Sequence, residues 1–167
     1  MNEQRDQRDI NMKYFIVFCI ALYALSVFAD SKTYTVAGDS MSPALVSGDR
    51  VVVSSDRMVQ LSRGDLVAIR FKHSDTPIVK RVVAVEGDRV EIKDASILVN
   101  GQKYRQIDMA RWKTTMTQLE RYGWVVPSKN IFVLGDNPDS SLDSRRLGLI
   151  SVDQVEGRVV KIIRKDE

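Results

Sequence analysis

The sequence predicts an all-β, mainly antiparallel domain that follows one N-terminal transmembrane helix. Two patterns support this architecture. Sixteen consecutive uncharged residues, from Tyr14 to Ala29, precede a change of pattern near Thr33. From there onward, short β-branched runs alternate with Gly-Asp and Asn-Gly turns, which is typical of antiparallel sheets and not of alternating β-α units. The chain of 167 residues has room for one ordinary domain with an N-terminal extension.

The apolar segment 14–29 fits a short membrane anchor. As a helix it would extend about 24 Å, somewhat less than the roughly 30 Å hydrocarbon core of a bilayer. The hydrophobic region of a secretory signal has a similar length, and Val27-Phe28-Ala29 has the small-residue ending of a cleavage site. The pattern favours an anchor over a cleaved signal and over a buried helix of a soluble domain, and it leaves cleavage after Ala29 open.

Basic residues predict the orientation of this anchor. Three of them precede the apolar segment, whereas Lys32 is the only one between its end and Arg50. Basic residues that flank a membrane helix tend to remain in the cytoplasm. Residues 1–13 are therefore expected to form a cytoplasmic tail, and residues 30–167 an extracytoplasmic β-rich domain.

Eight strands are predicted beyond the anchor, each a short run rich in β-branched or aromatic residues. Gly-Asp or Asn-Gly pairs separate several of them, at Gly48, Gly64, Gly87 and Gly101, and such pairs favour tight turns. The stretch from about Tyr104 to Tyr122 alternates less clearly and is expected to be a loop-rich insertion or a short helix. The predicted strands are Tyr34–Ala37, Arg50–Val53, Leu66–Phe71, Ile78–Glu86, Arg89–Ile92, Ile97–Val99, Asn130–Leu134 and Gly157–Ile163.

The composition excludes several classes of site. The single cysteine, Cys19, lies in the apolar segment and leaves no partner for a disulfide or a multi-cysteine zinc site. The single histidine, His73, excludes a multi-histidine metal centre. The net charge of +3 is spread along the chain, so no basic stretch indicates nucleic-acid binding. Neither a metal, nor an organic cofactor, nor a nucleic acid is expected as a partner.

Ser40 and Lys80 have the residue types and surroundings of a nucleophile and its base. Ser40 lies in G-D-S-M-S-P at 38–43, and a serine hydroxyl needs a base to act as a nucleophile. Lys80 lies within an apolar strand, where loss of hydration would lower its pKa. A fall from about 10.4 to near neutrality requires roughly 4 kcal/mol of desolvation. Without Ser40, a solvated edge-strand lysine would be the simpler interpretation; the neighbouring Arg81 points to the opposite face and is expected to be exposed or paired.

The segment 134–148 is dense in Asp, Asn and Ser, as surface turns commonly are. Its D-x-N-x-D spacing matches part of a calcium loop, but the positions that require Gly and Glu hold Ser141 and Leu147. A calcium site is therefore rejected. The better interpretation is a hydrogen-bonded scaffold in which Asp143 pairs with Arg145 and Ser141 reaches a neighbouring amine, orienting a lysine without charging it.

Four segments together resemble the successive conserved boxes of bacterial type I signal peptidases. They are G-D-S-M-S-P-A-L at 38–45, R-G-D-L-V at 63–67, K-R-V-V-A-V-E-G-D at 80–88 and G-D-N-P-D-S-S-L-D-S-R-R-L-G at 135–148. They follow the family's order after an N-terminal anchor, and with their flanks they span most of residues 34–163. The resemblance implies a signal-peptidase-like β domain that acts as a membrane-bound serine endopeptidase. Such an enzyme uses a Ser–Lys dyad to remove signal peptides from exported preproteins.

The resemblance also implies roles for the matching residues. Ser40 would be the nucleophile and Lys80 the general base. Ser141 would hydrogen-bond the lysine amine, while Asp143 with Arg145 would brace the site. The expected partners are exported preproteins, bound as an added strand at a sheet edge, and the lipid bilayer. The expected location is the cytoplasmic (inner) membrane, crossed once, with the catalytic domain on the periplasmic side.

Other positions shape the expected substrate site. Met41 would line the substrate groove, and the Ser40 N–H would supply one oxyanion donor. Gly38 stands where some family members carry a serine that completes the oxyanion hole, which leaves the second donor open. Three further departures indicate a specialised branch, and with the short chain they suggest a dedicated conjugative pilin-processing peptidase. These departures are Ala44, Pro138 and Ser140.

Two other functions remain open from the sequence. A self-cleaving repressor-type peptidase also uses Ser–Lys chemistry after a similar turn, but it requires an N-terminal DNA-binding helix-turn-helix, which the apolar segment contradicts. A non-catalytic anchored β module would instead bind exported peptides or assembly partners. The two interpretations, enzyme and binding module, differ in whether Ser40 and Lys80 lie within hydrogen-bonding reach.

Overall fold

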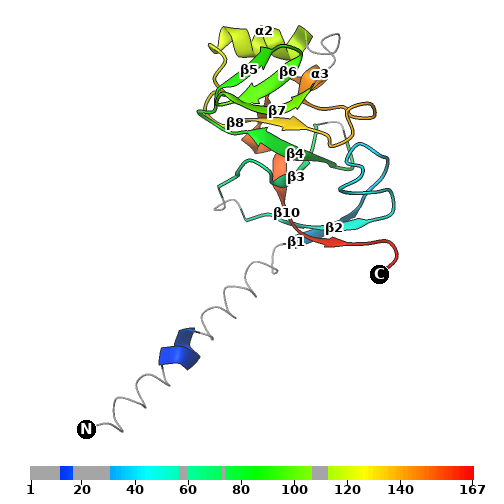
Figure 1. Cartoon of the computed structure of the whole chain (residues 1–167). Helices are drawn as coiled ribbons and strands as arrows, with labels where there is room; N and C mark the ends of the chain where they lie inside the picture. Colours follow the sequence, from blue (N-terminus) through cyan, green and yellow to red (C-terminus); the bar gives the residue numbers. More distant parts are fainter. Residues whose placement is uncertain (1–11, 17–30, 57–59, 73, 107–112) are drawn as a thin grey trace, which may run out of the picture. The chain divides into compact units, whose positions relative to one another are not determined.

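A computed structural model describes residues 12–16, 31–56, 60–72, 74–106 and 113–167 (Figure 1). The chain forms two compact units, residues 1–31 and 32–167. In the first unit, residues 12–16 are helical and their large apolar side chains are exposed. Within the described residues, no helix has the length and apolar character needed to cross a membrane. Most of the anchor predicted at 14–29, and His73, lie outside these residues.

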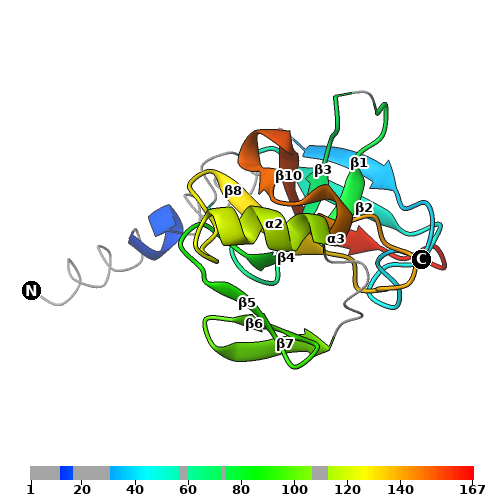
Figure 2. The ribbon, with the colours of Figure 1, turned by 90° about the horizontal axis from the view of Figure 1, so that it is seen from above.

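The domain is mainly antiparallel β-sheet, as the sequence predicts, and most of its strands belong to one sheet. Seven of them pair in the order β1-β2-β10-β3-β4-β8-β9, and the remaining three form a second sheet in the order β5-β6-β7 (Figure 1). The registers determined within both sheets are antiparallel. Figure 2 shows β5, β6 and β7 as a separate layer. The strands are β1 (Ser31–Thr35), β2 (Arg50–Ser54), β3 (Leu66–Ile69), β4 (Ile78–Ala84), β5 (Val90–Lys93), β6 (Ser96–Val99), β7 (Gln102–Gln106), β8 (Asn130–Leu134), β9 (Ile150–Ser151) and β10 (Val155–Ile163).

Strands that follow one another in the sequence are not always neighbours in the main sheet. The C-terminal strand β10 lies between β2 and β3, so it joins the pair β1-β2 to the rest of the main sheet. Strand β4 lies between β3 and β8, but β8 pairs with it only from Arg81 onward. The edge of Ile78–Lys80 that faces away from β3 therefore carries no strand among the described residues.

Two tight hairpins build the small sheet. Lys93 pairs with Ser96 across Asp94-Ala95, and Val99 pairs with Gln102 across Asn100-Gly101. All four turn residues have positive φ, between 50° and 78°, which is the geometry of two-residue type I′ hairpins. The Asn-Gly pair therefore leads directly into β7, a strand that the sequence analysis does not predict because its side chains are polar and mostly exposed.

Among the described residues, two α-helices and one 3₁₀ turn accompany the sheets. The helix α2 (Lys113–Arg121) and the strand β7 together account for much of the stretch 104–122, for which the sequence leaves a loop or a short helix open. The helix α3 (Ser144–Leu147) and the 3₁₀ turn η2 (Val152–Gln154) are not predicted. Helices α2 and α3 lie side by side in Figures 1 and 2 and are in contact.

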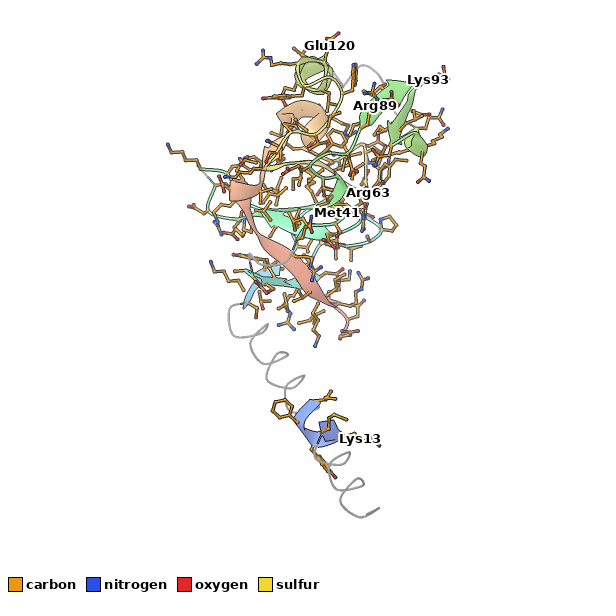
Figure 3. All side chains as sticks on the ribbon, turned by 90° about the vertical axis from the view of Figure 1, so that its left-hand side faces the viewer. Lys13, Met41, Arg63, Arg89, Lys93 and Glu120 are labelled. Atoms are coloured by element: carbon orange, nitrogen blue, oxygen red, sulfur yellow. The ribbon has the colours of Figure 1, made fainter. Side chains whose placement is uncertain are left out.

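Buried apolar side chains join these layers. One cluster packs Val83 of β4 and Phe132 of β8 against the small sheet and against Leu119 of α2. Another packs Met41 and Leu45 against strands β2 and β3. In Figure 3, Met41 lies within the domain, whereas Arg89, Lys93 and Glu120 lie at its periphery. The second cluster anchors the turn that carries Ser40.

Candidate active site

Ser40 lies on a tight turn, and two residues that follow it, Met41 and Leu45, are fixed in the core. The Ser42 N–H donates to the Asp39 carbonyl at 3.1 Å, and the Leu45 N–H donates to the Met41 carbonyl at 2.8 Å. Met41 and Leu45 are 1% and 0% exposed, so the residue after the serine is held by packing. Ser40 itself is only partly buried, which leaves its hydroxyl within reach of a substrate.

Lys80 projects from β4 directly to this serine. Its Nζ donates to Ser40 Oγ at 2.8 Å and to the Val79 carbonyl oxygen at 2.8 Å. The side chain is 2% exposed, although it is an amine. The structure thus brings together two residues that stand 40 positions apart in the chain.

Burial changes the protonation of this lysine. Desolvation lowers the pKa of Lys80 from 10.5 to about 8, and the charge of Arg145 adds to this effect. The Asp143 and Asp136 carboxylates oppose it. An unshifted lysine would be neutral in only about 0.3% of molecules at pH 8. At the lowered pKa about half of the Lys80 amines are neutral at that pH, as a general base requires.

Asp143 and Arg145 form a buried ion pair near Lys80, as the sequence predicts. Arg145 Nε lies 2.8 Å from Asp143 Oδ1, and Arg145 NH2 lies 2.9 Å from Oδ2. Asp143 is fully buried and also caps α3 by accepting from the Arg145 N–H. Burial alone would raise the pKa of Asp143, but hydrogen bonds from Arg145 and from the Gly135 N–H hold it below its ordinary value. The carboxylate therefore stays charged next to its guanidinium partner.

Ser141 does not make the hydrogen bond to the lysine amine that the sequence analysis expects. Its Oγ is buried and has no hydrogen-bond partner of acceptable geometry, although it lies near enough to Asp143 to help lower the pKa of that carboxyl. The hydrogen bonds of Lys80 Nζ go to Ser40 and Val79 instead. The Ser141 hydroxyl is buried without being bonded to the Lys80 amine.

Arg81, the residue after the lysine, is paired as expected. Its Nε donates to Asp136 Oδ1 at 2.8 Å, and its NH2 donates to Oδ2 at 2.5 Å. Its NH1 also donates to the Gly64 carbonyl at 2.9 Å. This bidentate pair ties β4 to the segment that follows β8.

Gly135 occupies a position that the sequence analysis does not single out. A Cβ at this residue would lie 2.2 Å from Ser141 Oγ and 2.5 Å from the Ser40 carbonyl oxygen. Its N–H donates to Asp143 Oδ2 at 2.9 Å. The only signal in the sequence is that glycine opens G-D-N-P, which a surface turn would explain equally well. The close approach of Ser141 and of the Ser40 carbonyl is the reason that this position has no side chain.

The backbone of the turn around Ser40 is held by a hydrogen bond from the segment that follows β8. Gly38 has a φ of +82° and open space where a Cβ would be. The Ser40 carbonyl accepts from the Asn137 N–H at 3.1 Å, which fixes the peptide plane after the serine. This bond holds the backbone of the turn while the hydroxyl faces Lys80.

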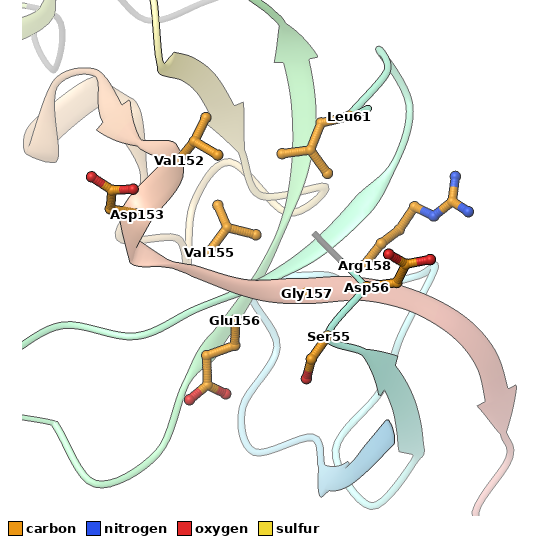
Figure 4. Close-up of a pocket in the computed structure, with 9 residues that line it drawn as sticks. All are labelled: Ser55, Asp56, Leu61, Val152, Asp153, Val155, Glu156, Gly157 and Arg158. Carbon is orange, nitrogen blue, oxygen red and sulfur yellow. The ribbon is translucent and has the colours of Figure 1, made fainter. Parts of the chain in front are cut away.

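The cavity shown in Figure 4 lies elsewhere on the main sheet. It has a volume of about 100 Å³, and it is lined by residues of η2 and β10 together with residues 55, 56 and 61. Neither Ser40 nor Lys80 lines it. The Ser40–Lys80 pair is therefore separate from this cavity.

Comparison with known proteins shows the family to which the chain belongs. The family model described as signal peptidase, peptidase S26, matches residues 9–163. The signal peptidase I of Bacillus caldolyticus is 33% identical over 172 residues, which cover 95% of this chain and 92% of the relative. Signal peptidase IB of Staphylococcus aureus is 32% identical over 166 residues, or 90% of this chain and 83% of the relative. A crystal structure of a signal peptidase I from Enterococcus faecalis superposes with a TM-score of 0.45 at 27% identity, covering 61% of this chain and 98% of the other.

Proposed function

The chain belongs to the signal peptidase family, peptidase S26, and from that premise we propose that Ser40 is its nucleophile and Lys80 its general base. As a serine peptidase of this family, it removes signal peptides from exported preproteins. The observation that carries the assignment is the 2.8 Å distance between Lys80 Nζ and Ser40 Oγ.

The reaction is an acyl transfer in two stages. Neutral Lys80 accepts the hydroxyl proton as Ser40 Oγ attacks the carbonyl carbon of the scissile peptide, and the lysinium then protonates the leaving amine. Water, deprotonated by the same lysine, attacks the resulting ester and releases Ser40. The Ser40 N–H would stabilise the oxyanion of both tetrahedral intermediates, a kind of interaction that is worth about a hundred- to a thousandfold in rate.

The substrate is proposed to bind as an extended strand beside β4. The edge of Ile78–Lys80 that faces away from β3 has no strand partner among the described residues, because β8 begins to pair only at Arg81. A peptide added there would continue the sheet and end at the lysine. Alternate side chains would then face the enzyme, which accounts for a preference for small residues at the first and third positions before the cut.

The location and a narrower substrate are also proposals. The apolar segment 14–29 would hold the enzyme in the cytoplasmic membrane, with residues 1–13 in the cytoplasm and the catalytic domain outside it. The lipid bilayer is then a permanent partner. The departures at Ala44, Pro138 and Ser140 support a dedicated pilin substrate as the second candidate.

Cleavage of a purified preprotein tests the function. The full chain in detergent is expected to cut a preprotein with an Ala-x-Ala site, and mass spectrometry of the product should place the cut after the second alanine. A matched preprotein with Lys-x-Lys at these positions serves as the control and should remain intact. Cleavage of a pilin precursor alone would select the dedicated enzyme. Cleavage of neither substrate would contradict the proposal.

The rate is expected to depend on pH through Lys80. Since the pKa of this amine is lowered to about 8, kcat/KM should rise with pH as the lysinium loses its proton and level off above that value. Below it, the rate should fall about tenfold for each pH unit. Steady-state assays between pH 5 and 9, with circular dichroism at each pH to confirm the fold, provide the measurement. A rate that does not change over this range would rule out lysine as the base.

A further inference from the structure

Arg105 connects the small sheet to the active site. The residue belongs to β7 and pairs with Ile97 of β6, but its guanidinium reaches out of that sheet. Its NH1 donates to the Gly135 carbonyl at 2.8 Å, and its NH2 donates to the Asp136 carbonyl at 3.4 Å. Both acceptors follow the end of β8 directly. One side chain therefore binds two consecutive peptide groups of the segment that borders the dyad.

Residues 135–137 contact the main chain of Ser40. The Asn137 N–H donates to the Ser40 carbonyl at 3.1 Å. Gly135 touches the same carbonyl so closely that a Cβ would lie 2.5 Å from it. A displacement of residues 135–137 would therefore displace the Ser40 peptide and change the distance from its hydroxyl to Lys80.

Two arginines from different elements hold Asp136 in place. Arg81 of β4 binds its carboxylate through Nε and NH2, while Arg105 of β7 binds its main-chain carbonyl. The carboxylate can rotate about its side-chain bonds, so the Arg81 pair alone does not fix the peptide plane. The contacts from Arg105 restrict the backbone itself.

We propose that Arg105 is a positioning residue for the peptidase reaction, which acts by holding segment 135–137 against the Ser40 peptide. The inference rests on the proposed role of Ser40 as nucleophile. Arg105 is bonded to neither Ser40 nor Lys80, so its effect passes through Gly135 and Asn137. A planar guanidinium can bridge two adjacent carbonyls with fixed geometry, and an ammonium group cannot reproduce that fork. A misplacement of about 1 Å at reacting atoms can cost about a hundredfold in rate.

Steady-state kinetics of Arg105 variants test this role. Arg105→Ala is expected to lower kcat by about tenfold to a hundredfold, with KM within about threefold of the wild type, because substrate contacts at β4 are retained. Guanidinium ions at non-denaturing concentration should restore part of the lost kcat by occupying the vacated site. Lys103→Ala removes an exposed cation from the same strand and is the matched control, expected to behave as wild type.

Three results would overturn the inference. The first is a wild-type kcat in Arg105→Ala. The second is a raised KM with an unchanged kcat. The third is a lowered kcat that guanidinium ions do not restore. If Arg105→Ala fails to fold, Arg105→Lys carries the test, because it keeps the charge and loses the fork. Its kcat should then be lowered, and a wild-type value would equally overturn the proposal.

A parallel Ser40→Ala assay separates this inference from the proposed function. If Ser40→Ala still cleaves the preprotein, the assignment of the nucleophile is wrong, and the argument for Arg105 is overturned with it. If Ser40→Ala is inactive while Arg105→Ala retains the wild-type kcat, only the positioning role is overturned. An inactive Ser40→Ala together with a guanidinium-restored Arg105→Ala supports both.

Discussion

Replacing Lys80 by arginine is expected to abolish cleavage while leaving the sheet intact. A guanidinium keeps its proton at all accessible pH values and cannot accept one from the Ser40 hydroxyl. The expected fall in kcat is roughly 10⁴- to 10⁶-fold, the range seen when one member of a serine peptidase catalytic unit is removed. Cleavage of the Ala-x-Ala preprotein, followed by single-turnover assays, measures it.

Lys80→Met separates the loss of the base from any disturbance of packing. Methionine is similar in length to lysine and carries no charge that burial would desolvate. In the wild type, the pKa of Lys80 falls by 2.5 units, from 10.5 to about 8. This fall corresponds to about 3 kcal/mol of desolvation cost in the folded state. This cost is present below pH 8 and disappears as the pH rises above 10.5, where the amine is neutral in both the folded and the unfolded chain. Lys80→Met should therefore be inactive and at least as stable as the wild type at pH 7. Retention of more than a trace of activity in either variant would exclude Lys80 as the base.

Replacing Asp143 by alanine is expected to lower both stability and activity. The substitution leaves the Arg145 guanidinium, which is 7% exposed, without its charge partner, and breaking a buried pair in this way costs about 3–5 kcal/mol. It also removes the cap of α3 and the acceptor of the Gly135 N–H. Chemical denaturation gives the change in the free energy of unfolding, and the cleavage assay gives the change in kcat.

Two comparisons make the Asp143 result specific. Asp139→Ala removes an exposed carboxylate from the same loop and should change the free energy of unfolding by less than about 0.5 kcal/mol. A double-mutant cycle with Arg145→Met should show strong coupling, because the second substitution removes the uncompensated charge. An Asp143→Ala variant with wild-type stability and rate would show that this ion pair does not brace the site.

The strands that are continuous apolar runs, such as β2 and β8, could be predicted from the sequence, and the polar strand β7 could not. Strand β8 has the predicted bounds, and β2 extends one residue beyond them, because β-branched side chains there are buried on a pleated surface. Strand β7 was missed because its polar, mostly exposed residues have no apolar face. Its position is set by the Asn100-Gly101 turn, which pairs Val99 with Gln102.

The short helix α3 shows how a local pattern can have two interpretations. The segment around Asp143 has the composition of a surface turn, yet the same aspartate is an N-cap residue whose side chain accepts from the Arg145 N–H. Contact with α2 and burial of Ser144 and Arg145 stabilise the helical alternative. Four residues are too few for a helix to be stable alone, so tertiary packing decides.

The sequence by itself determined the fold class and the chemical types of the site. Three local features of the sequence indicate the site. They are an apolar strand around Lys80, a serine in a Gly-Asp turn and an aspartate two positions before an arginine. The Asp143–Arg145 pair could be predicted because its partners are neighbours in the chain. Only the tertiary structure decided which groups meet across distant segments. It set the distance from Lys80 to Ser40, left Ser141 without a bond to the amine, and brought Arg105 of another sheet to the Gly135 carbonyl. These contacts depend on how strands and turns pack, because a difference of about 1 Å decides whether a hydrogen bond forms, and no local pattern of residues specifies a distance that finely.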